Sequence, residues 1–72
     1  MNRDYSRFPI LKYFAFAHLP EHLQGISKPF GDLAYKIVNR FLDAESHDIA
    51  ETIVAVRKLL EAKDAAVRAM VK

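Results

Sequence analysis

The stretch KPFGDLAYKIVNRFLD, residues 28–43, has the apolar repeat of an amphipathic helix. Its apolar side chains alternate steps of three and one along the chain, and this spacing puts them on one helical face. They are Phe30, Leu33, Ala34, Ile37, Val38, Phe41 and Leu42. Ser27 is a favoured N-cap residue, and Pro29 suits the first turn of a helix. We therefore predict a helix over 28–43 whose N-cap is Ser27.

A longer helix is predicted over 47–71. The segment DAESHD, residues 43–48, interrupts the apolar repeat, and Ser46 can cap the helix that follows, with Asp48 in its first turn. The apolar side chains of this helix span roughly half of its circumference, which is more than a two-helix hairpin needs to cover. They are Ile49, Ile53, Ala55, Val56, Leu59, Leu60, Ala62, Ala66, Val67, Met70 and Val71. The excess is mostly alanine, so we predict an antiparallel hairpin that oligomerises. A monomer whose N-terminal arm covers this face is the alternative.

The N-terminal segment 1–19 shows no sustained helical repeat, and Pro9 interrupts its apolar side chains. We predict an irregular or extended arm that lies across the rest of the fold. Pro20 suits the start of a short helix over 20–25. The predicted fold is therefore a single all-α domain, 1–72, with an irregular arm, a short helix and then an antiparallel two-helix hairpin.

Composition restricts the classes of protein that this chain can belong to. A chain of 72 residues buries only about 60% of its unfolded surface, and it contains no cysteine for a disulfide or a thiolate metal site. Small folds of this kind depend on well-packed helices or on oligomerisation, and the lack of cysteine favours the cytoplasm. The net charge of +2 is too small for a DNA-coating protein. No apolar run is long enough for a membrane span, and the N-terminus does not resemble a signal peptide.

No enzymatic motif passes a physical test. HLPEH, residues 18–22, matches the H-x-x-E-H zinc-protease pattern, but Pro20 separates the two histidines that would have to share one helical face. The serines have no triad setting, and the two glycines, Gly25 and Gly31, are too few for a phosphate-binding loop. We expect a protein that is not an enzyme and that has no cofactor and no metal.

The segment Ser27-Lys28-Pro29 is the candidate anion site. A helix N-terminus offers unpaired N–H groups to an anion, and Lys28 adds a full positive charge there. Tyr13 has a ring that could stack on a nucleobase and a hydroxyl that must reach water or a partner, whereas Phe14 and Phe16 suit the core. The alternative is an exposed lysine without a special role.

Two features of the predicted helix 47–71 bear on function. Asp64 and Arg68 can form an ion pair on the polar face, which is ordinarily only a solvated surface, but arginines repeated around a symmetry axis would bind several phosphates. Lys63 interrupts the apolar arc, and we expect its ammonium to reach water while its stem covers apolar surface. A subunit boundary with an acidic partner is the alternative for Lys63.

The run FAHLPEHLQGISKPFGDLA, residues 16–34, resembles the signature of the phage anti-CBASS cyclic-oligonucleotide sponges. These proteins share a helical-hairpin domain with a Thoeris anti-defence sponge. The resemblance implies a small all-helical protein that forms homohexamers in the host bacterial cytoplasm. It also implies binding of cyclic dinucleotides, and in some members of cyclic trinucleotides, without cleavage, so that the immune effector is starved of its second messenger.

The resemblance also implies roles for particular residues. In the family, the dinucleotide pocket lies between protomers and uses a tyrosine for the base and a lysine for the phosphate. Tyr13 and Lys28 hold the matching positions, with Ser27 beside the lysine. A late arginine serves the separate trinucleotide site, and Arg68 is its counterpart. The competing hypothesis is a small helical interaction module that docks its apolar face on a partner protein, with Tyr13 and Lys28 at the rim.

Overall fold

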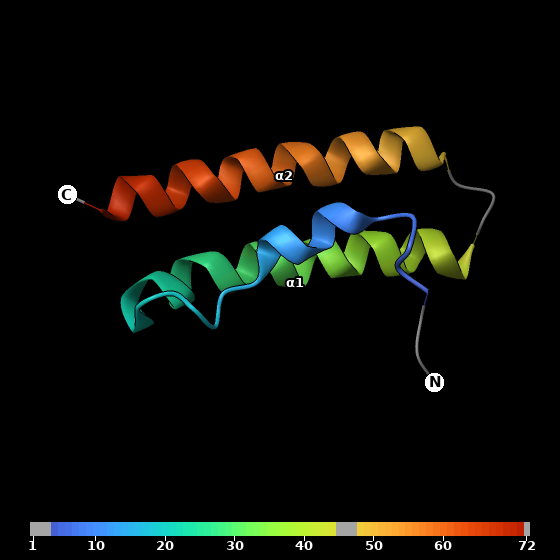
Figure 1. The fold of residues 1–72 in the computed structure, drawn as a ribbon. Coiled ribbons are helices and arrows are strands. Elements are labelled where there is room, and N and C mark those ends of the chain that lie inside the picture. Colours follow the sequence, from blue (N-terminus) through green and yellow to red (C-terminus); the bar gives the residue numbers. More distant parts are fainter. Residues whose placement is uncertain (1–3, 45–47, 72) are drawn as a thin grey trace.

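The structure, a computed structural model, describes residues 4–44 and 48–71 of the chain. Within these ranges the regular elements are a 3₁₀ helix, η1 (Pro9–Phe14), and two α-helices, α1 (Glu21–Asp43) and α2 (Ile49–Met70). The two α-helices lie side by side and antiparallel, and the arm that carries η1 packs on both of them (Figure 1). The prediction of an all-helical hairpin is therefore confirmed.

The predicted break between a short helix over 20–25 and a second helix over 28–43 is wrong, because α1 runs through both without interruption. Ser27 is consequently no N-cap and lies in the helix interior with Pro29. An interior proline costs about 3 kcal/mol, since it removes one backbone hydrogen bond. A continuous apolar face offsets this cost, because the buried residues of α1 follow one another at steps of three and four across the predicted break. They are Leu23, Ser27, Gly31, Ala34, Val38 and Phe41.

The prediction of an irregular arm over 1–19 holds only outside η1. Phe8, Leu11 and Phe14 are all buried, and their spacing of three residues is the repeat of a 3₁₀ helix rather than of an α-helix. Pro9 is the first residue of η1, where its missing N–H costs nothing. We interpreted Pro9 as an interruption of the apolar pattern, but it is the residue at which a helix begins.

The beginning of the arm is attached to α1 by polar and aromatic contacts. The Tyr5 hydroxyl donates to Asn39 Oδ1 at 2.8 Å, and the Tyr5 ring meets Tyr35 edge-on with 5.4 Å between the ring centroids. The Ser6 N–H donates to Asp4 Oδ1 at 2.9 Å, and this hydrogen bond, together with that of the Ser6 side chain, lowers the pKa of Asp4. The arm therefore begins in a defined place on α1.

The helix α2 begins at Ile49 and its N-cap is Asp48, whose carboxylate accepts the Glu51 N–H. We predicted Ser46 as the cap and a start at residue 47, and both positions lie outside the described residues. Asp48 is an N-cap and not a first-turn residue, because its own backbone is extended. The other end of α2, at Met70, agrees with the predicted end at 71 to within one residue.

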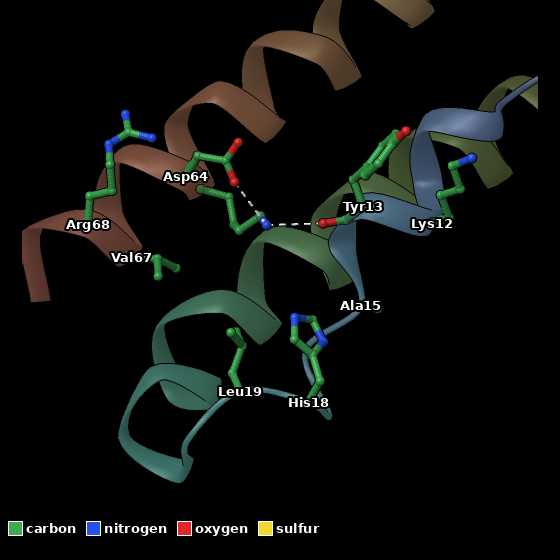
Figure 2. A pocket seen from close by; sticks show the side chains of 9 residues that line it. Lys12, Tyr13, Ala15, His18, Leu19, Asp64, Val67 and Arg68 are labelled. Atoms are coloured by element: carbon green, nitrogen blue, oxygen red, sulfur yellow. Dashed lines mark hydrogen bonds and ion pairs between the residues drawn. The ribbon is translucent and has the colours of Figure 1, made fainter. Parts of the chain in front are cut away.

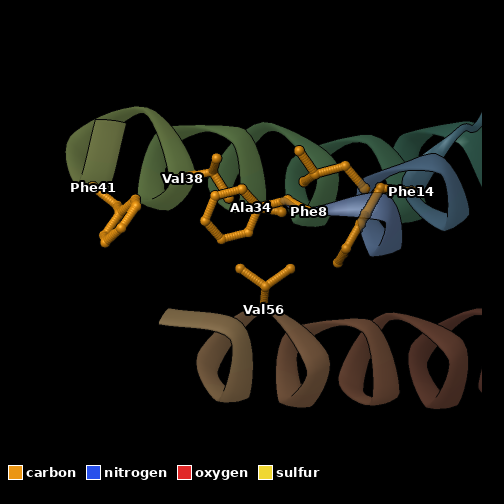
Figure 3. Close-up of a cluster of buried hydrophobic side chains, with 7 residues drawn as sticks. Phe8, Phe14, Ala34, Val38, Phe41 and Val56 are labelled. Atoms are coloured by element: carbon orange, nitrogen blue, oxygen red, sulfur yellow. The ribbon is translucent and has the colours of Figure 1, made fainter. Parts of the chain in front are cut away.

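The core is one layer of side chains between the arm and the two α-helices. Val56 of α2 points toward Phe8 of the arm and toward Ala34 and Val38 of α1 (Figure 3). The Phe8 and Phe41 rings meet at a steep angle with 5.7 Å between their centroids, which is a favourable edge-to-face contact. The arm therefore supplies core side chains, and its position is set by the same packing that holds the hairpin.

Candidate functional site

A cavity of about 380 Å³ lies between the arm and the C-terminal half of α2, and we call it the arm cavity. Its volume falls within the range of small-molecule sites. Its polar and charged lining consists of Lys12, Tyr13, His18, Lys63, Asp64 and Arg68. Figure 2 shows Tyr13 and Arg68 on either side of Asp64. The structure thus brings together two of the predicted site residues, one from each end of the chain.

Tyr13 presents its ring to solvent at this cavity. The residue is 57% exposed, although its neighbour Phe14 is buried, because one step along the 3₁₀ helix η1 turns the side chain from the core to the surface. The Lys12 ammonium lies 5.1 Å from the centroid of the Tyr13 ring, within the range of a cation–π contact. An exposed aromatic face beside a cation is a suitable surface for a nucleobase that carries a phosphate.

The charged groups of the arm cavity are unequal in sign. Lys12, Lys63 and Arg68 are positive and Asp64 is negative, so the lining has a surplus of two positive charges when His18 is neutral. The predicted ion pair of Asp64 with Arg68 is wrong for the described part of the chain, where Asp64 Oδ1 pairs with Lys63 Nζ at 3.0 Å. Arg68 is exposed and is left oriented toward solvent at the cavity (Figure 2). The balance of charge favours an anionic ligand.

Lys63 does not extend into water as we predicted. It is only 9% exposed, and its ammonium donates to the backbone carbonyl of Tyr13 at 3.0 Å besides pairing with Asp64. The arm covers this part of α2. The ammonium therefore contacts a carbonyl and a carboxylate, whereas on an isolated helix it would be exposed to solvent. Within the chain, the acidic partner of Lys63 is Asp64, and the alternative of a subunit boundary at Lys63 stays a prediction.

Lys28 lies on a different hollow, a groove of about 310 Å³ between the arm and α1 that we call the Lys28 groove. Its ammonium pairs with Asp32 Oδ2 at 2.8 Å, one helical turn further along α1, and both side chains are more than half exposed. Lys12 lines both hollows, whereas Tyr13 lines only the arm cavity. Within one chain, therefore, the described structure does not bring Tyr13 and Lys28 to the same hollow.

The helix start at which we predicted an anion site is absent at residues 27–29. These are the seventh to ninth residues of α1, where the helix itself uses the backbone N–H groups that an N-terminus would leave free. Ser27 is completely buried, and its hydroxyl has no hydrogen-bond partner. Of the three residues in this segment, Lys28 alone has an exposed side chain with a charge that can attract an anion.

Two charged residues of the arm cavity were missed from the sequence as site residues. Lys63 had a signal, since a charge in an apolar arc of a helix requires an explanation, but its partner is 50 residues away and only the path of the arm shows it. For Lys12, nothing in the sequence indicated a role in a site apart from its position next to Tyr13. His18 was considered only as a zinc ligand, and the structure places it in the lining of the arm cavity.

Across 4–44 and 48–71, no group of three or more His, Cys, Asp or Glu side chains is arranged to hold a metal ion. In the same ranges, neither α-helix has the combination of length and apolar character that a membrane crossing requires. Comparisons of the chain with protein-family models, curated proteins and solved structures found no match.

Proposed function

We propose that this protein binds cyclic dinucleotides without cleaving them and so sequesters the second messengers of antiphage CBASS-type signalling in the bacterial cytoplasm. The observation that carries the proposal is the exposed Tyr13 ring at a cavity with a surplus of two positive charges. The resemblance of residues 16–34 to the sponge family supports the ligand class. The lack of a recognisable nucleophile setting in the sequence supports binding without turnover.

The chemistry of the ligand fits the arm cavity in two respects. One nucleobase would stack on the face of Tyr13, a contact worth about 1–3 kcal/mol. The phosphodiesters of a cyclic dinucleotide are anionic, and Lys12 and Arg68 would make charge-assisted contacts with them. Cyclic trinucleotides carry one more base and one more phosphate. The resemblance gives them a separate site at the counterpart of Arg68, but Arg68 lines the arm cavity with Tyr13, so we propose that cyclic trinucleotides bind at this cavity as well.

A second copy of the chain would bring Lys28 to the ligand. Lys28 and Tyr13 line different hollows of one protomer, so a shared ligand requires either two protomers or a ligand that spans the arm. We propose the first, a homohexamer with the pocket between protomers, in agreement with the family resemblance. The exposed positions of both side chains are compatible with contacts from a neighbouring copy.

The direct test is isothermal titration with 3′,3′-cyclic GMP–AMP. We expect binding by the parent protein and a loss of about tenfold or more in Tyr13→Ala, because the stacking contact is removed. Lys28→Ala and Arg68→Ala should each weaken binding, and Lys36→Ala, which removes an exposed lysine of α1 outside both hollows, should bind like the parent. No binding by the folded parent at micromolar concentrations would refute the proposal.

A second candidate function is the docking of a partner protein. It is favoured by Leu33, which is 46% exposed and lines a shallow apolar groove of about 170 Å³ with Phe30 and Leu59. Thermal unfolding distinguishes the two functions, because a ligand that binds only the folded state raises the midpoint, and the stabilisation grows with the logarithm of the ligand concentration once this exceeds the dissociation constant. A sponge gains thermal stability from cyclic dinucleotides, and a docking module does not.

A further inference from the structure

The backbone carbonyl of Tyr13 lies at the end of η1, where a helix leaves its last carbonyl groups without partners of its own. The next N–H available as a cap, that of Ala15, donates to the Lys12 carbonyl instead. The Tyr13 carbonyl accepts from the Lys63 ammonium at 3.0 Å. A side chain of α2 therefore caps the 3₁₀ helix of the arm, across 50 residues of sequence.

Lys63 is an unusual choice for this place. It is 91% buried, and burial of an ammonium group costs free energy that an apolar side chain of similar size would not. Lys63 lies outside the apolar cluster of core side chains. What the charge adds is a directional contact with one backbone atom of the arm and a second with Asp64.

The opposite side of the same turn is held by α1. A Cβ atom on Gly31 would lie 3.3 Å from the Phe14 carbonyl oxygen and 3.4 Å from the Phe14 Cβ, so the arm sits close against the glycine backbone. At the end of η1, α1 therefore packs closely against Phe14 through Gly31, and α2 holds the Tyr13 carbonyl through Lys63. The Tyr13 ring itself is mostly exposed and lies beside the flexible side chain of Lys12, so its place follows chiefly from its backbone.

We infer that Lys63 is the positioning residue for Tyr13: it holds the backbone from which the ring is presented to the arm cavity, and so it controls ligand affinity. The inference rests on the proposed function for its ligand, but the contact between Lys63 and the Tyr13 carbonyl can be tested without one. A positioning residue improves affinity by reducing the ordering that binding requires. Removal of Lys63 should accordingly reduce the free energy of ligand binding by more than it reduces the free energy of unfolding.

The first part of the experiment detects the contact in the ligand-free protein. Tyr13–Phe14 is the only Tyr-Phe pair in the sequence, so labelling with ¹³C′-tyrosine and ¹⁵N-phenylalanine gives one carbonyl–amide NMR signal that reports the Tyr13 carbonyl. In Lys63→Met, which keeps an apolar stem and loses the donor, we expect this ¹³C′ resonance to move upfield. The matched control is Lys58→Met, which removes an exposed lysine of α2 and should leave the resonance in place.

The second part measures affinity and stability on the same proteins. For Lys63→Met we expect a thermal midpoint close to that of the parent, because relief of a buried charge is offset by the loss of the hydrogen bond to the Tyr13 carbonyl and of the partner of the half-exposed Asp64. We expect its affinity for 3′,3′-cyclic GMP–AMP to fall by about tenfold. A purely structural lysine would lower stability and affinity together, so this separation is the signature of positioning. Lys63→Gln and Lys63→Arg extend the series, and affinity should follow the Tyr13 carbonyl shift across it.

The outcomes separate the inference from the proposed function. A parent that binds no cyclic dinucleotide overturns the proposed function, whatever the carbonyl shift. A Lys63→Met protein whose carbonyl signal is unchanged, or whose affinity equals that of the parent, overturns the inference alone. If Lys63→Met does not fold, the comparison of shift with affinity in Lys63→Gln and Lys63→Arg decides, and affinity that varies independently of the shift counts against positioning.

Discussion

Ser27 and Lys28 are adjacent in the sequence but lie in opposite environments on α1. Ser27 is 0% exposed and its hydroxyl has no partner, whereas Lys28 is exposed and pairs with Asp32 along the helix surface. One residue turns an α-helix by about 100°, and this rotation separates the two side chains. A role for both residues at one phosphate therefore requires the helix start that the structure does not contain.

Ser27→Ala should stabilise the protein by about 1 kcal/mol. The substitution removes a buried hydroxyl that has no hydrogen bond and places a better helix former in the interior of α1. Urea denaturation followed by circular dichroism measures the change. Titration with cyclic dinucleotide should give the same affinity as the parent, because the side chain is not accessible. A destabilised Ser27→Ala protein would mean that the hydroxyl has a partner after all.

At the scale of elements, α1 shows how far burial outweighs local signals. A glycine at 25 and a proline at 29 both disfavour a helix interior, by about 1 and 3 kcal/mol respectively. The helix nevertheless continues from Glu21 to Asp43, because its buried face also runs through this segment. Gly31 has a positive role, since its lack of a side chain lets Phe14 approach. Gly31 is therefore needed for the packing of the arm, whereas Gly25 has no contact that requires a glycine.

The same substitution at these two glycines should have different effects. Gly25→Ala places a methyl group in open space on an interior helical position, so we expect stabilisation by about 0.5–1 kcal/mol. Gly31→Ala places it 3.3 Å from the Phe14 carbonyl oxygen, so the arm must shift and the helical gain should be lost or reversed. Chemical denaturation of both variants measures the pair. Equal gains at both positions would show that the arm does not pack against Gly31 as described.

The hairpin could be predicted from the sequence because its evidence is periodic and long. The repeats in 28–43 and 47–71 each extend over several turns, and such patterns determine both the type and the inward face of a helix. The 3₁₀ repeat of η1 covers only two turns, which is too short for its period of three to identify a helix. Tyr13 could be identified from its residue type, but its proximity to Arg68 depends on the path of the arm, which no local pattern encodes.

As a whole, the molecule is thin and has an excess of surface. Its extents are 43 × 26 × 15 Å, and its accessible surface of 5149 Å² exceeds the roughly 4500 Å² expected for a compact chain of 8.2 kDa. A single layer of two α-helices and an arm has no second layer to cover its other face. Several large apolar side chains are exposed in consequence. They are Tyr13, Leu33, Tyr35, Met70 and Val71.

Self-association would cover this apolar surface, and Leu33 is the position at which to test it. We expect the parent to sediment as a homo-oligomer, at six times the chain mass of 8.2 kDa if the proposed hexamer forms. Leu33→Glu should sediment as a single chain with its helical circular dichroism retained. A charge is tolerated at an exposed site of the monomer but is costly when an interface buries it without a partner.

Lys58→Glu is the control for this experiment, because it introduces the same carboxylate at an exposed position of α2 that lines none of the hollows described. It should sediment like the parent. If the parent itself is a single chain at micromolar concentration, the arm alone covers the hairpin, and the pocket between protomers is refuted. Titration of that monomer with cyclic dinucleotide would then show whether Tyr13, Lys12 and Arg68 of one chain suffice for binding.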